Sequence, residues 1–516
     1  MPNTSHAADD DQIVPDSVIP HGQLPPMTYR DLPEPVPIRR MIGPSLLLAG
    51  LALGSGEFVL WPYITYKSQF IFFWACLIGA VTQYFLNMEI TRWTLATGES
   101  AITGFCRISR HFAWIFLLLN IIPWMLPAWA TGSAEILSWI VWPPVDDGTG
   151  AIVAQNDQYV APLAIAGLFL CGIVFTLGPV IYETVEKIQL TLISLSFVLM
   201  LALTFCLVRG DAVMAQFQST LTLGYPDFFP QQSEFTKELD PILLLGALAF
   251  AGVGGTLNLG QSNYVKDKGY GMGQYIGRIT SPITGQVESV SSIGFLFRDT
   301  EQNMTRWRQW WRRANIEHLL SFLLTCLVCL VLLTLISYSI FYTADGQLLD
   351  GAERYGKGMN FVLGQAEQIG ERIGPLARLG FCIMGMTLLL TTEIGVLDGA
   401  SRISSDIVKV NWLPGHKWWT ESRLYYLFLW GMILLGTGIL LLKMVGYNVS
   451  AFNLFKLTAA MNGGVMFLYS MTLLYLNCRM LPPPLRTSPL RRIILCWSVL
   501  FFGFFALFAG WYTIVG

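Results

Sequence analysis

Apolar runs of about twenty residues recur almost from end to end of this 516-residue chain, and the segments between them are mostly short. A helix of roughly 20 apolar residues spans a hydrocarbon core of about 30 Å. Candidate spans lie at 41–64, 70–91, 112–142, 160–178, 185–208, 241–265, 315–343, 375–398, 424–446, 453–478 and 493–515. The sequence therefore predicts an all-α integral membrane protein with eleven transmembrane helices.

The composition favours one membrane domain. Only 13% of the residues are charged, against roughly 25% in soluble domains, whereas 53% are hydrophobic. Residues 1–38 are rich in proline and acidic residues and lack apolar periodicity, so we expect a disordered cytoplasmic tail there. Residues 39–516 are expected to form the transmembrane domain.

Basic residues are distributed unevenly between the expected loops. Arg39 and Arg40 precede the first span and a strongly basic segment at 264–313 follows the sixth, whereas the loop containing Asp146 and Asp157 holds no basic residue. The positive-inside rule places the N-terminus in the cytoplasm and, with an odd number of spans, the C-terminus outside. The chain is thus predicted to be a multi-pass protein of the plasma (cell inner) membrane. Its partners are expected to be the lipid bilayer and a small substrate, with no nucleic acid.

An internal repeat relates the first and sixth spans. Pro44 opens PSLLLAGLALGSGE, and Pro241 opens PILLLGALAFAGVG. Because the offset of five spans is odd, the two matching helices cross the membrane in opposite directions. We therefore expect an inverted five-helix repeat, with repeat one at about 41–208, repeat two at about 241–478 and an additional helix at about 490–516. Inverted repeats with broken helices are typical of secondary transporters, which bind substrate near the bilayer midplane.

Both matching helices carry glycine clusters near their middles. The clusters are Gly54, Ser55, Gly56 and Glu57 in the first helix, and Gly252, Gly254 and Gly255 in the second. Glycine weakens a helix, and freed backbone groups are tolerated where they line a cavity. Close helix packing through small residues is the alternative. Paired clusters, one of them followed by an acid, favour a broken first helix in each repeat and a substrate or ion site at the breaks.

Acidic residues inside the spans are candidates for ion or proton pathways, because charge in a bilayer is costly. Glu57 is the leading candidate as a metal ligand and proton carrier, with a helix cap as the alternative. Glu135 is a second proton-relay candidate or a hydrogen-bonded structural acid. Glu393 has no evident partner in sequence and is an ion-site candidate, whereas Asp398 and Arg402, four residues apart, are expected to pair along one helical face.

Other polar residues give weaker signals. Asn258, Gln261 and Asn462 are candidate oxygen ligands, although each is also typical of a hydrogen bond between packed helices. Cys326 and Cys329 lie within an apolar run without a second cysteine pair, which favours a structural role over a zinc or redox site.

Several classes of function lack their sequence signals. No histidine lies in the middle of a span, which argues against a histidine-based metal or proton site. No phosphate-binding loop is present, so ATP-driven transport is not expected. We expect neither an enzyme with catalytic residues nor a bound cofactor.

Several residues in the first part of the chain occur at a characteristic spacing: Gly43-Pro44, Trp74, Gln83, Thr97-Gly98 and Cys106-Arg107. The Nramp family of proton-coupled divalent-metal transporters shows this spacing between its first two helices, so the first part of the chain resembles that family. The segment from Ala130 to Glu135 is similar to the third-helix Asp-x-x-Glu of that family, with Gly132 in place of the aspartate. Glu186 is similar to the acid that opens its fifth helix. The resemblance implies a leucine-transporter-type fold.

The departures from the family concern the metal site. Its Asp-Pro-Gly-Asn reads Gly54-Ser55-Gly56-Glu57 here, and its Met-Pro-His reads approximately Gly255-Thr256-Leu257. The ligating aspartate and the soft methionine sulfur are therefore replaced. The resemblance implies a divergent branch whose oxygen-only site would suit magnesium or manganese.

The leading hypothesis is a secondary active transporter of a divalent metal cation, the substrate, with proton coupling. The alternative is a proton- or sodium-coupled permease for an amino acid or other small organic solute. It rests on the Gly-Ser-Gly-x-Phe segment from Gly54 to Phe58, which is similar to the first-helix signature of amino-acid/polyamine permeases. A non-transporting membrane scaffold or sensor with the same fold is the third hypothesis.

Overall fold

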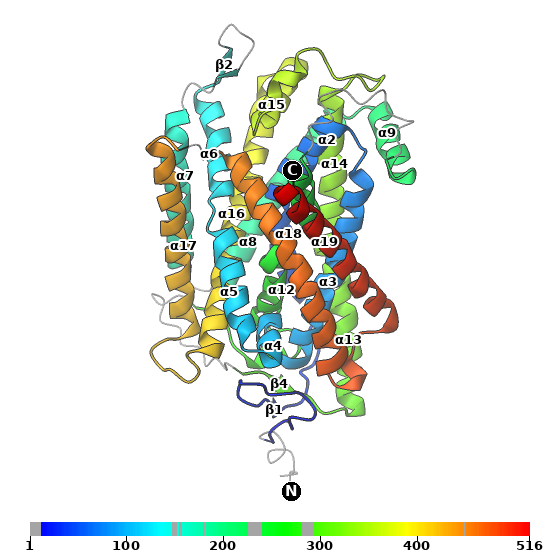
Figure 1. The fold of residues 1–516 in the computed structure, drawn as a ribbon, viewed down its shortest axis with the longest axis vertical. Helices are drawn as coiled ribbons and strands as arrows, with labels where there is room; N and C mark the ends of the chain where they lie inside the picture. Colours follow the sequence, from blue (N-terminus) through cyan, green and yellow to red (C-terminus); the bar gives the residue numbers. More distant parts are fainter. Residues whose placement is uncertain are drawn as a thin grey trace.

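The computed structural model describes residues 12–146, 152–153, 157–178, 181–224, 240–280, 293–447 and 449–515. The chain forms an elongated bundle of helices, most of which run along the long axis of the molecule (Figure 1). The first half contains α1 (Pro44–Ala52), α2 (Trp61–Ser68), α3 (Phe73–Thr97), α4 (Ala101–Ile108), α5 (His111–Trp124), α6 (Ala128–Val141), α7 (Asp157–Leu177), α8 (Ile181–Leu207) and α9 (Gly210–Leu221). The second half contains α11 (Pro241–Ala249), α12 (Gly255–Lys268), α13 (Glu301–His318), α14 (Thr325–Phe341), α15 (Asn360–Arg372), α16 (Pro375–Asn411), α17 (Glu421–Met444), α18 (Ala451–Tyr475) and α19 (Pro489–Val515).

Shorter elements complete the fold. The strands are β1 (Thr28–Tyr29), β2 (Val145–Asp146), β3 (Ile152–Val153) and β4 (Phe295–Leu296), and β1 pairs with β4 while β2 pairs with β3. Three π-helical stretches continue longer helices, at Leu53–Leu60, Leu319–Leu324 and Leu476–Met480.

Within the described part of the chain, nine helices are long and apolar enough to cross a membrane. They are Pro44–Ser68, His111–Val141, Asp157–Leu177, Ile181–Leu207, Glu301–Phe341, Pro375–Asn411, Glu421–Met444, Ala451–Met480 and Pro489–Trp511. The chain is thus a multi-pass membrane protein. The two other expected spans, 70–91 and 241–265, correspond to α3, which contains the buried ion pair of Glu89 and Arg92, and to the pair of short helices α11 and α12. The count of eleven and the repeat remain predictions.

The first glycine cluster widens its helix instead of breaking it. From Pro44 to Ser68 the helix is continuous, and its residues Leu53–Leu60 are π-helical, with the Trp61 N–H donating to the Gly56 carbonyl. Thr392 of α16 supports the stretch, because its hydroxyl accepts from the Gly54 N–H and donates to the Gly50 carbonyl, both at 3.0 Å. A hydroxyl from a neighbouring helix therefore replaces a lost helical hydrogen bond, and the expected break in the first helix is wrong.

The second glycine cluster does interrupt its helix. α11 ends at Ala249 and α12 begins at Gly255, so five residues leave the helical path. Gly254 and Gly255 have φ angles of +78° and +58°, a region that favours glycine. The sequence of this segment therefore specifies the break directly.

α16 lies inside the bundle and organises it. It packs against α6, α8 and α17, and it also contacts the helix that begins at Pro44. Large hydrophobic side chains on outer helices are exposed, as Phe205 of α8 and Leu507 of α19 illustrate at 92% and 69%. Such residues are expected to face lipid.

Residues 12–38, here called the N-terminal segment, are ordered at the lower end of the bundle (Figure 1). Val14, Met27 and Leu32 are fully buried. The side chain of Trp310 donates to the Pro33 carbonyl at 2.9 Å, and α13 supplies further donors to this segment. The expectation of a disordered tail is therefore wrong for residues 12–38, because prolines that lack an N–H still offer carbonyls to donors on α13. Residues 1–11 lie outside the described residues.

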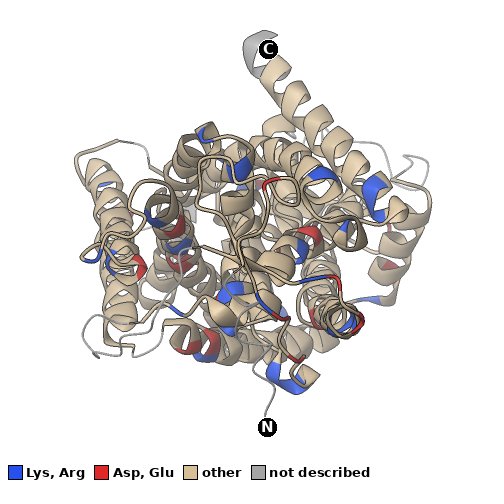
Figure 2. Cartoon of the chain, turned by 90° about the horizontal axis from the view of Figure 1, so that it is seen from below, with Lys and Arg blue, Asp and Glu red and all other residues tan. Residues whose placement is uncertain are grey.

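A buried ion cluster lies at the same end of the molecule, where Figure 2 shows basic and acidic residues on neighbouring helices. Arg402 donates to Asp398 at 2.8 Å and also pairs with Asp267 of α12. The expected pair of Asp398 and Arg402 is thus present. Lys266 joins Asp406 of α16 at 2.8 Å and Glu421 of α17 at 3.1 Å, a second contact that extends the cluster.

The positive-inside rule gives a testable orientation. Epitope tags placed near residues 1 and 300 are expected to be inaccessible to antibodies in intact cells, whereas tags near residues 150 and 516 are expected to be accessible. Permeabilised cells, in which all four tags should react, provide the control. Accessibility of a tag at residue 300 in intact cells would reverse the orientation.

Candidate functional site

Glu57 lies within the π-helical stretch, and its side chain is fully buried. Within the described part of the chain, neither carboxylate oxygen accepts a hydrogen bond from a nitrogen or hydroxyl group of another residue. The thiol of Cys326, on α14, lies beside the carboxylate as a weak donor, and the thiols of Cys76 and Cys329 also lie near it. A buried carboxylate without donors is unfavourable unless a cation or a proton reaches it. Glu57 is therefore the side chain in this region most in need of a positively charged ligand.

Gly56 brings the first glycine cluster into contact with the end of α11. A Cβ atom on Gly56 would lie only 1.4 Å from the carbonyl oxygen of Phe250, the C-cap residue that follows α11. On Gly54, a Cβ atom would lie 2.5 Å from the Leu388 carbonyl oxygen. Both glycines thus permit close packing, the alternative that the sequence left open, and they place Glu57 next to the broken helix. The side chain of Ser55 lies outside the described residues.

Gly56→Ala is expected to prevent this contact. Because a backbone carbonyl blocks the added methyl group, the helices must separate, at a cost of roughly 1–3 kcal/mol or more. Thermal melting of the purified protein is expected to fall, together with the yield of folded protein. Gly431→Ala, on α17, is the matched control, because nothing lies within 4 Å of its Cβ position. Equal melting temperatures for the two variants would contradict the close contact.

Gln83 of α3 bridges the break between α11 and α12. Its amide nitrogen donates to the Ala249 carbonyl at 2.8 Å, and its amide oxygen accepts from the Gly254 N–H and from Asn258, both at 3.3 Å. A Cβ atom on Gly252 would lie 2.6 Å from the same amide oxygen. One side chain therefore holds both ends of the break.

Two amide oxygens near the start of α12 have no donor among the described residues. Asn258 donates to the Tyr469 hydroxyl at 3.0 Å, and its Oδ1 is unpartnered. Asn462 of α18 donates to the Thr458 carbonyl at 2.9 Å, and its unpartnered Oδ1 lies over Gly255, where a Cβ atom would be 1.7 Å away. Both side chains could thus offer a neutral oxygen to a bound ion or solute.

Three of the expected site residues make contacts elsewhere. Glu393 accepts a hydrogen bond at 3.1 Å from the N–H of Ala130, near the start of α6. Glu393, which has no evident partner in the sequence, thus has a backbone donor in the structure, and its role as an ion-site residue stays a prediction. Glu135 accepts from the N–H of Ala451, at the start of α18, at 3.5 Å. Both acids stabilise helix N-termini, where exposed N–H groups favour negative charge. Gln261 faces a different buried cluster, near Ser45.

Aromatic side chains that the sequence did not single out surround the end of α11. The rings of Trp124 and Trp129 lie 6.0 and 6.2 Å from that of Phe250, and Phe455 lies 5.4 Å from Trp129. Trp124 donates to the Thr256 hydroxyl at 2.8 Å, whereas the indole N–H of Trp129 has no partner among the described residues. We call these four rings the aromatic wall. In the sequence, the one available signal for this wall is the pair of tryptophans, Trp124 at the end of α5 and Trp129 at the start of α6.

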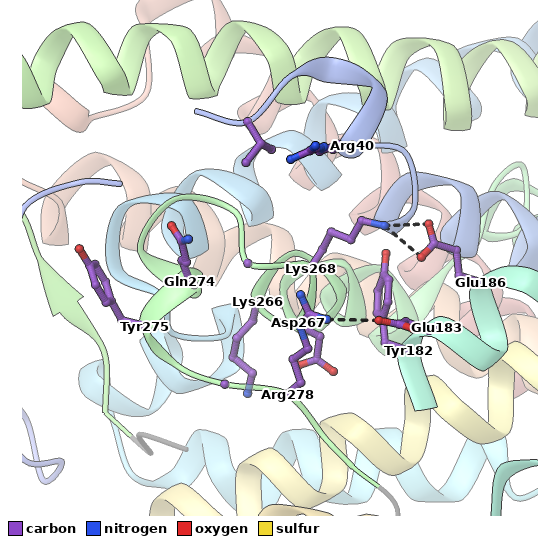
Figure 3. Close-up of a pocket in the computed structure, with 14 residues that line it drawn as sticks. Arg40, Tyr182, Glu183, Glu186, Lys266, Asp267, Lys268, Gln274, Tyr275 and Arg278 are labelled. Atoms are coloured by element: carbon purple, nitrogen blue, oxygen red, sulfur yellow. Dashed lines mark hydrogen bonds and ion pairs between the residues drawn. The ribbon is translucent and has the colours of Figure 1, made fainter. Parts of the chain in front are cut away.

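A cavity of about 740 Å³ opens at the end of the bundle that carries the N-terminal segment (Figure 3). We call it the vestibule. Charged side chains line it: Lys268 pairs with Glu186 at 2.9 Å, and Arg278 pairs with Glu183 at 3.5 Å. Tyr182 stands beside the pair of Lys268 and Glu186. The vestibule thus presents both signs of charge at the mouth of the bundle.

The described residues contain no group of three acidic, histidine or cysteine side chains placed to hold a metal ion. A cation at Glu57 would therefore need backbone carbonyls, amide oxygens or water as its other ligands. The neighbouring Cys326 also means that the surroundings of Glu57 are not made of oxygen alone.

The fold matches solved structures of transporters. The manganese transporter of Eremococcus coleocola, in complex with an aromatic bis-isothiourea substituted compound, aligns with a TM-score of 0.63 and 12% identity over 93% of this chain and 88% of the other. A mutant of the same transporter aligns at 0.61 and 11% over 93% and 89%. MhsT in complex with L-phenylalanine aligns at 0.50 and 13% over 90% and 97%. No family model matches the chain, and no curated protein matches its sequence. The likeness shows that this chain shares the fold of these transporter structures.

Proposed function

We propose that this chain is a secondary active transporter whose substrate, a divalent metal cation, binds at Glu57. The observation that carries the proposal is the fully buried carboxylate without a nitrogen or hydroxyl donor from another residue, held where the π-helical stretch touches the end of α11. Broken and distorted helices near the centre of a bundle are where secondary transporters bind substrate. The solved structures with this fold, including a manganese transporter, give independent support.

Two features of the site adapt it to release as well as binding. One carboxylate gives a weaker site than several would, and weak binding allows the cation to leave on the other side of the membrane. A proton can also neutralise Glu57 when no cation is bound. We therefore infer that cation and proton compete for this carboxylate. Competition of this kind couples the flux of one to the flux of the other.

Flux measurements in proteoliposomes test the proposal. Vesicles containing the purified protein are expected to take up manganese or magnesium, and unlabelled divalent cations are expected to compete. Vesicles without protein and vesicles with Glu57→Gln protein are the controls. Absence of uptake for every divalent cation tested would refute the proposal.

The aromatic wall favours a second candidate, a permease for an amino acid or another organic solute. Four rings and the unpartnered indole N–H of Trp129 offer an apolar surface with one donor beside the N-terminus of α12. A helix N-terminus attracts a carboxylate group of a solute. MhsT, solved with L-phenylalanine, has a related fold. Uptake inhibited by amino acids and not by divalent cations would favour this candidate, and Trp129→Ala should then abolish uptake.

A further inference from the structure

A second buried polar cluster lies near the start of α1, away from Glu57. The Ser45 hydroxyl lies 2.5 Å from Oε2 of Glu317 and 2.8 Å from Nδ1 of His318, both at the end of α13. Gln261 of α12 donates to the same hydroxyl at 3.4 Å. All four side chains are at most 3% exposed. His318 is thus buried and hydrogen-bonded within this cluster, although it does not lie in the middle of an expected span.

The cluster has unused hydrogen-bonding capacity. Oε1 of Glu317, Nε2 of His318 and Oε1 of Gln261 have no partner among the described residues. The hydroxyl of Ser45 carries a single proton. It can donate that proton to Glu317 while it accepts from His318, or donate to His318 while it accepts from a protonated Glu317. The geometry allows both arrangements without movement of a heavy atom.

We propose that Glu317, Ser45 and His318 form a proton-binding relay on the vestibule side of the bundle, separate from Glu57. A proton that arrives at Nε2 of His318 releases the proton of Nδ1 to the Ser45 oxygen, and the Ser45 proton passes to Oε2 of Glu317. The histidine ends neutral, with its proton on Nε2, and the carboxylate ends as a carboxylic acid. One proton enters and one is stored, so the charge of the cluster rises by one.

The groups around the relay fit a site that gains and loses a proton. On the α8 and α12 side, Gly43 separates Glu317 from the vestibule, since a Cβ atom there would lie 2.3 Å from the Tyr182 hydroxyl, 2.7 Å from Glu186 and 3.1 Å from Lys268. The backbone at Gly43 therefore contacts both Glu317 of the relay and the charged wall of the vestibule.

Other elements contribute few charges. The ring of His318 stacks between those of Tyr84 of α3, at 5.4 Å, and Phe322, at 4.7 Å. On the α3 side of His318, Arg491 of α19 is the cation that interacts with the imidazole. The hydroxyl of Tyr270 donates a hydrogen bond to the Met41 carbonyl, near the start of α1. The relay thus lies between basic groups on two sides, Lys268 near Glu317 and Arg491 near His318.

The position of the relay links protonation to the helix that carries Glu57. Glu317 lies close to the N–H groups of Gly43 and Ser45, at the N-terminus of α1. These N–H groups attract negative charge, so neutralising Glu317 weakens the electrostatic attraction between the end of α13 and the N-terminus of α1. α1 continues without interruption into the π-helical stretch. This coupling to transport rests on the proposed function, whereas proton binding by the relay does not.

Infrared difference spectroscopy of the purified protein tests proton binding directly. A carbonyl stretching band of a protonated carboxyl is expected to appear as the pH is lowered and to disappear in Glu317→Gln, which keeps the acceptor for Ser45. Ser45→Ala should shift the pH at which the band appears by roughly one unit or more, because it removes a hydrogen bond to the carboxylate. Glu183→Gln, a half-exposed acid of the vestibule, is the matched control and should leave the band unchanged.

The outcomes separate the relay from the transport proposal. A wild-type protein without a titrating carboxyl band, or a band that survives in Glu317→Gln, overturns the relay whatever the protein transports. Where cation uptake is observed, Glu317→Gln is expected to make its rate nearly independent of pH while uptake persists. Uptake with an unchanged pH dependence in Glu317→Gln overturns the coupling. Absence of uptake in every variant refutes the proposed function and leaves the infrared result valid.

Discussion

Glu57→Gln is expected to abolish cation uptake while leaving the fold intact. Glutamine has nearly the shape of glutamate and remains buried beside Cys326, but it carries no charge. The substitution also removes a charged group without donors from the membrane interior, so it should not lower stability. Uptake of labelled cation into proteoliposomes, at matched protein content, gives the comparison with wild type.

Two further variants sharpen the test at Glu57. Glu57→Asp keeps the charge but shortens its reach, and we expect weak residual uptake. Glu371→Gln, on the exposed face of α15, removes an acid far from the bundle interior and should retain full uptake. Full uptake by Glu57→Gln would reduce Glu57 to a structural residue. The site would then be sought around Asn258 and Asn462.

Arg402→Gln is expected to destabilise the protein more than any other single substitution considered above. Arg402 is 0% exposed and pairs with Asp398 on its own helix, α16, and with Asp267 on α12. The second pair joins the two helices. Without it, two buried carboxylates lose their main counter-charge. Breaking a buried pair by removing one partner costs about 3–5 kcal/mol. The melting temperature of the purified protein should fall by many degrees.

A control on the same helix isolates the ionic effect. Arg378→Gln changes a partly exposed arginine of α16, where charge interactions are weak, and should leave the melting temperature almost unchanged. The double variant Arg402→Gln with Asp398→Asn is expected to recover part of the loss, because it removes one unpaired charge. A melting temperature of Arg402→Gln equal to that of wild type would show that the cluster does not hold the helices together.

The sequence predicted features that depend on local pattern. Three features follow from rules that act within one helix. They are the length and apolarity of the spans, the pairing of Asp398 with Arg402 four residues later, and the positive φ angle of Gly254. Among its described residues the structure shows nine helices of this length and apolarity, the pair of Asp398 and Arg402, and the positive φ angle of Gly254.

The features that the sequence did not predict depend on a partner from elsewhere in the chain. Gly54 and Gly56 resemble a helix break, yet Thr392, more than 300 residues away, supplies the hydroxyl that keeps the helix continuous. His318 lies at the end of an expected span, and only the packing of α1 and α3 around it makes it buried. Tertiary context overrides local propensity in both cases.

The N-terminal segment has a consequence for the order of assembly. Its strand β1 pairs with β4, so Thr28 cannot meet Phe295 until most of the first 300 residues have been made. At about 5–20 residues per second, synthesis of the intervening chain takes roughly 15–50 s. During this time the first helices are already inserted, and the segment waits without its partner. The N-terminal segment therefore closes the end of the bundle late in synthesis, when β4 becomes available to pair with β1.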